Sequence, residues 1–247
     1  MTESDITTSQ RPLSSEQVEA FYHDLFVEDQ TRHFVEMAPR PAASGVVVDV
    51  GGGCGFFARR LQQLTARRVR VIDMDPASVR ACHEAGVEAT RGDALAPVPA
   101  GDEEIASFNL IPHHLVADSE ADTRALQVRA LRAWHGRAQA VFVNEYIYES
   151  FIARLSGWLI FQITKSRVLS ALGRAVAHVV PAFKANTFGV GVRFRSHDEW
   201  VELFAQAGFR VEDRRIGEAE RVAPPLRVLF IRTIRRDSFL LRASTPA

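Results

Sequence analysis

The chain has 247 residues but little cysteine, no net charge and no long apolar run. Its two cysteines, Cys54 and Cys82, stand in neither CxxC nor Cys/His spacing, which argues against a disulfide framework and against a cysteine-bound metal. The formal net charge of +0 argues against a dedicated nucleic-acid partner. The most apolar stretch, Leu155–Ile163, is too short to span a bilayer, and the polar, acidic first residues are unlike a signal peptide. These absences predict a cytoplasmic protein with no integral membrane segment.

What the chain does have is a regular alternation of short apolar runs and amphipathic stretches. The β-branched run Val46–Val50 is typical of a buried strand, and the stretch Pro76–Ala85 places proline in the first turn of a helix. Strand–helix alternation of this kind predicts a parallel, doubly wound sheet with right-handed crossovers. We expect seven strands, of which the last two form an antiparallel pair at the sheet edge: 46–50, 69–73, 87–91, 104–109, 138–144, 210–216 and 226–234.

The alternation divides the chain into four parts. Residues 1–40 form a polar tail and a helical cap, and residues 41–149 form the first part of the α/β core. Residues 150–195 break the alternation with an aromatic, helical insertion, which we expect to be a lid, a homodimer interface or a membrane-surface contact. Residues 196–247 return to the core, because Ser196 and Glu199 have the spacing of a capping box.

A glycine cluster follows the first strand, in "VVVDVGGGCGFFARRL" (46–61). In open α/β sheets, ligands bind where the strands end and the first strand–helix turn begins. A dinucleotide fingerprint that starts at Gly51 needs glycine or alanine at position 56, which is Phe56, and the later register from Gly53 to Ala58 matches only weakly. A phosphate-binding P-loop is excluded because no G-K-[ST] follows.

The spacing D-x-G-x-G-x-G, formed by Asp49, Gly51, Gly53 and Gly55, resembles motif I of the class I S-adenosylmethionine-dependent methyltransferases. Three later segments, "VRVIDMDP", "RGDALAP" and "EIASFNLIPHHL", extend the resemblance over about residues 45–145. The resemblance implies a Rossmann-like α/β fold with S-adenosylmethionine as the cofactor. With the strands above, it predicts a mostly parallel seven-stranded sheet with an antiparallel edge strand, an N-terminal helical cap and an insertion after the fifth strand.

The resemblance also implies a role for individual residues. Asp75 competes with Asp73 for the ribose, although Asp75-Pro76 is typical of a helix cap, and Asp93 is alternatively a turn aspartate. The expected cofactor-binding residues are Asp49 for the ammonium group, Gly51, Gly53 and Gly55 beneath the ribose and methionine, Asp73 for the ribose hydroxyls, Met74 on the adenine, Asp93 and Ala94 at the adenine edge, and Asn109 beside the methionine.

Methyl transfer is an in-line displacement that chiefly requires alignment, and it needs a general base only for a protonated acceptor. The candidate catalytic residues are His113 as a base, Glu145 as a base or ammonium ligand, and Tyr22 on an N-terminal helix that closes over the site. Each also has a purely structural interpretation, as a helix start, a buried strand end or an ordinary helix face. We expect a small-molecule acceptor, methylated on oxygen or nitrogen, and no metal, because the sequence has no acidic cluster of the magnesium type.

Two other functions remain open from the sequence. The first is a methyltransferase-like partner or regulatory protein that binds the cofactor without turnover, because the binding residues alone do not establish catalysis. The second is an NAD-dependent oxidoreductase, which Phe56 disfavours.

Overall fold

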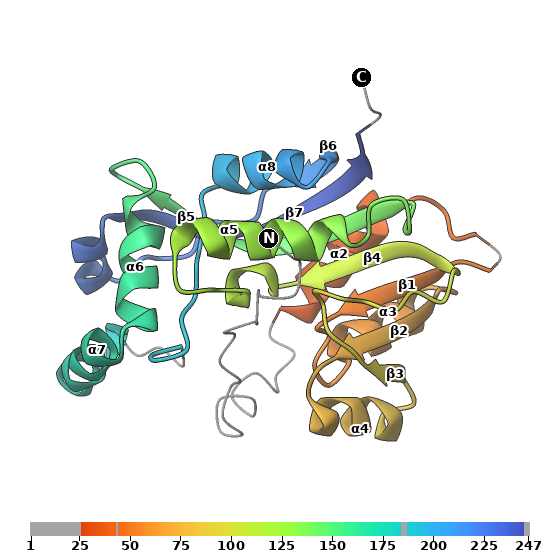
Figure 1. Ribbon diagram of the computed structural model, residues 1–247, viewed down its shortest axis with the longest axis horizontal. Coiled ribbons are helices and arrows are strands. Elements are labelled where there is room, and N and C mark those ends of the chain that lie inside the picture. Colours follow the sequence, from red (N-terminus) through yellow and green to blue (C-terminus); the bar gives the residue numbers. More distant parts are fainter. Residues whose placement is uncertain (1–25, 43, 184–186, 245–247) are drawn as a thin grey trace, which may run out of the picture.

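The computed structural model describes residues 26–42, 44–183 and 187–244, which are built around a seven-stranded sheet. Figure 1 shows the sheet, with strand order β3-β2-β1-β4-β5-β7-β6, and the helices that flank it. Strands β1 to β5 pair in parallel, whereas β7 runs antiparallel to both β5 and β6. The strands are β1 Val46–Val50, β2 Arg68–Asp73, β3 Glu88–Arg91, β4 Glu103–Asn109, β5 Ala140–Ser150, β6 Phe209–Arg215 and β7 Ile231–Ala243. The predicted doubly wound, mostly parallel sheet is confirmed.

The helices cover both faces of the sheet because alternate strand residues point to opposite sides. Val46, Val48 and Val50 pack with apolar residues of α5 and α8, while Val47 packs with those of α2 and α3. The α-helices are α2 Val27–Met37, α3 Phe56–Leu64, α4 Pro76–Glu84, α5 Glu120–Arg132, α6 Leu155–Lys165, α7 Arg167–Val179 and α8 His197–Gln206, and the 3-10 helices are η1 Pro112–His114, η2 Pro181–Phe183 and η3 Pro224–Leu229.

The sequence signals for helix starts are confirmed at two helices. Ser196 accepts a hydrogen bond from the backbone of Glu199, and the Glu199 side chain accepts one from the backbone of Ser196, which completes the capping box of α8. Asp75 caps α4 by accepting bonds from the backbone of Ala77 and Ser78. These caps fix where two helices begin, and therefore where the loops before them meet the sheet.

The C-terminal strands differ from the prediction. The stretch 226–234 is not one strand: Pro224 and Pro225 stand in the first turn of η3, where their fixed φ favours a helical turn, and that 3-10 helix continues to Leu229. Strand β7 begins only at Ile231 and continues to Ala243, so it pairs with β5 along the whole length of that strand. This pairing extends β5 to Ser150, past its predicted end at residue 144. The last two strands do form the expected antiparallel pair at the sheet edge, with β6 outermost and β7 one position in.

The insertion after β5 carries α6, α7 and η2, and these helices project beyond the end of the sheet beside η3 (Figure 1). Its last residues return to the sheet, where the backbone N–H of Tyr148 donates to the carbonyl of Arg195 at 3.0 Å. Among the described residues, no helix is long and apolar enough to cross a membrane.

Candidate functional site

The glycine turn between β1 and α3 is the first part of the site. Gly51, Gly53 and Gly55 all have positive φ, at 68°, 54° and 75°, which side chains rarely adopt. At Gly52 the requirement is one of space, because a Cβ there would overlap the buried carboxylate of Asp49. The turn is thus built around the end of β1, as motif I predicts.

Asp49 and Asn109 lie side by side where the neighbouring strands β1 and β4 end. The Asn109 amide donates to Asp49 Oδ1 at 3.0 Å, while Asp49 Oδ2 and Asn109 Oδ1 are buried with no hydrogen-bond partner in the described part of the chain. Burial raises the pKa of Asp49 to about 7, against the opposing effect of the hydrogen bond from Asn109. Two unsatisfied acceptor oxygens at one place are suited to a cationic donor such as an ammonium group.

Asp73 connects the end of β2 to the glycine turn. Its Oδ2 accepts from the backbone N–H of Gly53 at 2.9 Å, and its Oδ1 accepts from that of Asp75 at 2.8 Å. Burial raises the pKa of Asp73, although both backbone hydrogen bonds oppose the shift. Both carboxylates accept with both oxygens, Asp75 from α4 and Asp73 from the glycine turn and Asp75, so the contact with the turn is what distinguishes Asp73. The adjacent Met74 side chain is 56 % exposed.

Asp93 and Ala94 lie in the turn after β3, next to the end of β2. The backbone N–H of Gly92 donates to the carbonyl of Asp73 at 3.0 Å, which holds this turn near Asp73. The Asp93 side chain accepts from the backbone N–H of Leu95 at 2.8 Å. Asp93 is therefore a turn aspartate in this structure, with one carboxylate oxygen still available to a ligand.

His113, in η1 after β4, and Glu145, within β5, form a buried pair. His113 Nδ1 lies 2.8 Å from Glu145 Oε2, and the backbone N–H groups of His113 and Tyr146 donate to the two carboxyl oxygens. Burial raises the pKa of Glu145 to about 8 and lowers the pKa of His113 to about 3. The pair therefore disfavours charge, and near neutral pH the carboxyl group holds a proton and the imidazole is neutral.

Aromatic rings surround this pair. The His113 ring centroid lies 4.9 Å from that of Phe194 and 5.9 Å from that of Tyr146, and Phe194 stacks on Tyr148 at 4.2 Å. Phe194 was not predicted as a site residue, and it belongs to the end of the insertion. The sequence marks this region only by its aromatic, glycine-rich composition at 186–194, and that composition does not indicate which part of the sheet the chain rejoins.

The parts of the site lie along one edge of the sheet. In the strand register, Asn109 is opposite Asn144, directly before Glu145, so the cofactor candidates and the buried pair are on neighbouring strand ends. The structure therefore brings together all the predicted site residues except Tyr22. Tyr22 lies outside the described residues.

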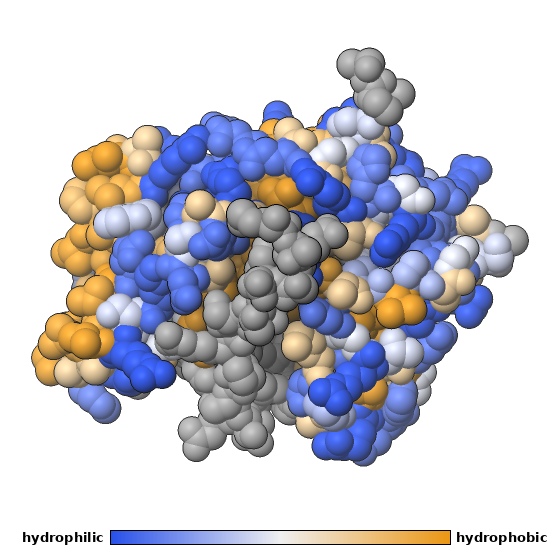
Figure 2. Space-filling view, in the orientation of Figure 1, coloured by the Kyte–Doolittle hydropathy of each residue, from blue (hydrophilic) through white to orange (hydrophobic). Residues whose placement is uncertain are grey.

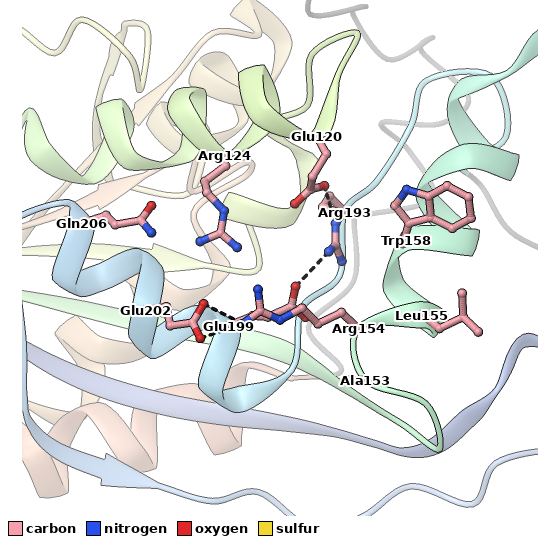
Figure 3. A pocket seen from close by; sticks show the side chains of 10 residues that line it. All are labelled: Glu120, Arg124, Ala153, Arg154, Leu155, Trp158, Arg193, Glu199, Glu202 and Gln206. Carbon is pink, nitrogen blue, oxygen red and sulfur yellow. Dashed lines mark hydrogen bonds and ion pairs between the residues drawn. The ribbon is translucent and has the colours of Figure 1, made fainter.

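Two cavities are found in the described part of the chain, one away from this edge and one that Asn144 also lines. The cavity in Figure 3 has a volume of about 480 Å³ and opens between α5, α6 and α8. At its wall Arg193 pairs with Glu120 at 2.6 Å and with Glu199 at 2.9 Å. The Arg193 backbone N–H donates to the carbonyl of His113 at 2.9 Å, so this ion-pair network anchors the segment that carries Phe194. The other cavity, of about 530 Å³, lies between α2 and residues 216–220.

The comparisons with known proteins establish the fold. No protein-family profile and no curated protein matches the sequence. A structure of a LepI variant in complex with SAH and a substrate analogue aligns with 86 % of this chain and 46 % of its own, at 15 % identity and a TM-score of 0.55. The mitomycin 7-O-methyltransferase MmcR aligns with 89 % of this chain and 54 % of its own, at 16 % identity and a TM-score of 0.53. A structure described as a pericyclic reaction enzyme aligns with 87 % of this chain and 47 % of its own, at 14 % identity and a TM-score of 0.54.

The chain thus spans about half the length of these three proteins. The fold is the Rossmann-like methyltransferase fold that the sequence predicted. Similarity at this level of identity concerns the fold, and the chemistry has to be argued from the site itself.

We predict that Gly52→Ala lowers the free energy of unfolding by about 1–3 kcal/mol, because its methyl group overlaps the buried Asp49 carboxylate. Urea unfolding measures the loss. In an Asp49→Ala background the overlap with the carboxylate is gone, so the same substitution should cost clearly less. Equal losses in the two backgrounds would contradict the steric role of Gly52.

Proposed function

We propose that the protein transfers a methyl group from S-adenosylmethionine to a small-molecule acceptor, on oxygen or nitrogen, with a hydroxyl group as the favoured acceptor and no metal ion. The observation that carries the proposal is the arrangement of Asp49 and Asp73 around one glycine turn, on strand ends next to a buried His113–Glu145 pair. The resident residues therefore offer a cofactor side and an acceptor side within one edge of the sheet.

The cofactor side suits S-adenosylmethionine in its donor set. The unsatisfied oxygens of Asp49 and Asn109 would receive the ammonium group. Asp73 retains lone pairs beyond its two backbone bonds, which would accept from the ribose hydroxyls. The exposed thioether of Met74 would pack on the adenine, with Asp93 and Ala94 at its edge. Because the turn is made mainly of glycines, backbone atoms would lie beneath the ribose and methionine parts of the cofactor.

The acceptor side supplies alignment and a base. S-adenosylmethionine brings an electrophilic methyl group on a sulfonium, which is already an excellent leaving group. The rings of Tyr146, Tyr148 and Phe194 line the surroundings of His113, which favours an aromatic acceptor that packs by edge and face contacts. When Glu145 is ionised, the imidazole Nδ1–H donates to it and Nε2 is left to take the proton from an acceptor hydroxyl.

The proposal can fail in two distinct ways. A protein that binds the cofactor without turnover would keep the Asp49 and Asp73 interactions and leave His113 without a reaction, whereas an NAD-dependent oxidoreductase would not bind S-adenosylmethionine. A cytoplasmic location is part of the proposal.

We predict that Asp73→Ala weakens S-adenosylmethionine binding at least about tenfold, because hydrogen bonds from the ribose to a charged group are lost. Isothermal titration calorimetry measures the affinity, with NAD as the competing ligand. Asp75→Ala is the matched control: it removes the α4 cap and should lower stability more than affinity. No binding to the wild-type protein would refute the proposed function, and loss of affinity only in Asp75→Ala would move the ribose to that residue.

We predict that the wild-type protein transfers isotopically labelled methyl groups to a phenolic acceptor, and that His113→Ala slows transfer by about 10²–10⁴-fold, the usual contribution of a general base. Mass identification of labelled products from metabolite extracts would find the acceptor. Cofactor affinity is the control, since His113 lies on the acceptor side. Binding without label transfer to any acceptor would favour the partner or regulatory alternative.

We predict that kcat/KM rises with pH up to about 8 and then levels off, because the carboxyl group of Glu145 has its pKa raised to about 8. Below that pH its proton occupies the Nδ1 side, the ring hydrogen moves to Nε2, and the base is blocked. Glu145→Gln cannot ionise, so its profile should lack this rise. A rise near pH 8 that persists in Glu145→Gln would assign the ionisation to another group.

A further inference from the structure

Helix α7 packs in the opposite sense from an ordinary surface helix. It buries Ser170 and Ala177, and Gly173 is in contact with Phe188, so its inner face is made of small residues. Its large apolar residues point outward: Val168 is 71 % exposed, Leu172 58 % and Val179 82 %. Residues 168, 172, 176 and 179 recur at helical spacing, so they form one stripe along the solvent side.

Neighbouring elements carry further exposed apolar residues. Trp158 of α6 is 43 % exposed, and Phe230, directly after η3, is exposed as well. Figure 2 shows hydrophobic side chains gathered on the end of the molecule where α6, α7 and η3 lie in Figure 1. We call the surface formed by Trp158, Val168, Leu172, Val176, Val179 and Phe230 the apolar face. A contiguous exposed surface of this kind marks an interaction site.

Arginine is in excess in the segments that carry the apolar face, although acidic residues also lie near it. Arg232 pairs with Glu149 at 3.8 Å. The cavity that Trp158 lines is also lined by Glu120, Glu199 and Glu202. Residues 150–195 and 221–236 hold 12 of the 30 Lys and Arg residues and none of the 30 Asp and Glu residues. Exposed arginines border the face, namely Arg167 and Arg174 on α7, Arg227 on η3 and Arg232 on β7. Arg227 also lies over the ring of the exposed Phe151, with 5.6 Å between its guanidinium carbon and the ring centroid.

We propose that the apolar face docks on the surface of an anionic lipid bilayer. Large apolar side chains on the outside of a short helix enter the boundary between headgroups and acyl chains, and the bordering arginines attract anionic headgroups. A second copy of the chain is disfavoured as the occupant, because a symmetric interface would bring the exposed Arg167, Arg174 and Arg227 of the two copies together. Within residues 26–42, 44–183 and 187–244 no helix is long and apolar enough to span, so the proposed contact is one of α6 and α7 with the bilayer surface. The proposal does not depend on methyl transfer.

The test is binding of the full-length protein to sedimented vesicles. We expect binding to vesicles of mixed phosphatidylcholine and phosphatidylglycerol, weakened by salt, and little binding to phosphatidylcholine alone. Trp134 and Trp200 are fully buried, so a shift of tryptophan emission to shorter wavelength would report on Trp158, and Trp158→Phe should abolish it. Equal binding to both vesicle types, or none, would overturn the proposal.

The matched variants are Leu172→Glu on α7 and Leu64→Glu on α3. Both leucines are about half exposed, but only Leu172 belongs to the apolar face. Leu172→Glu should weaken vesicle binding at least about tenfold through lost apolar burial and added negative charge, and Arg167→Glu should act similarly. Leu64→Glu should leave binding unchanged. Equal effects of the two leucine variants would overturn the proposal.

Two other possible occupants of the apolar face, a second copy of the chain and another part of the same chain, are tested without lipid. If acrylamide already fails to quench Trp158 in vesicle-free solution, protein covers the apolar face, from a second copy or from the chain itself, and the proposal is overturned. Analytical ultracentrifugation then separates these cases, since a homodimer that Leu172→Glu dissociates identifies the second copy. Lipid docking is supported if the protein is a monomer in which acrylamide quenches Trp158, and if adding anionic vesicles abolishes that quenching.

Discussion

The burial of the Asp49 carboxylate at the end of β1 is the constraint on which the site depends. β1 is covered on both faces and lies between β2 and β4, so its last polar side chain has no route to water. The chain gives this carboxylate one donor, the Asn109 amide, and leaves its other oxygen unsatisfied. An unpaired buried acceptor is costly, and proteins retain such atoms where a ligand supplies the missing donor. The space kept at Gly52 preserves that carboxylate at the foot of the turn.

Local sequence signals predicted most of the core and the glycine turn between β1 and α3. Strand–helix alternation, the capping box at Ser196 and the turn glycines act over a few residues, so their outcome can be read from short segments. The length of β5 could not be predicted, because its last residues are held by antiparallel pairing with β7, about 80 positions away at Ser150 and Ile231. The strand expected at 226–234 failed for a local reason, the prolines that begin η3.

The acceptor side was predictable only in its parts. His113 and Glu145 were each expected at strand ends, but their contact across 32 residues follows from the sheet register that sets β4 beside β5. Phe194 comes from the far end of the insertion, where no periodic pattern indicates the path of the chain. The shared fold does not supply the missing information either, because it is found in a mitomycin methyltransferase and in a protein described as a pericyclic reaction enzyme.

One segment links the site wall to the outer surface. The end of the insertion is tied to the site by the backbone bond from Arg193 to His113 and is anchored behind by the ion pairs of Arg193 and Arg195 with Glu120. Buried ion pairs of this kind fix geometry more than they add stability, because desolvation offsets much of their attraction. The helices α6 and α7 precede this anchor and present the apolar face. The apolar face and the residue Phe194, which packs against His113, therefore belong to one continuous insertion that the same ion pairs anchor.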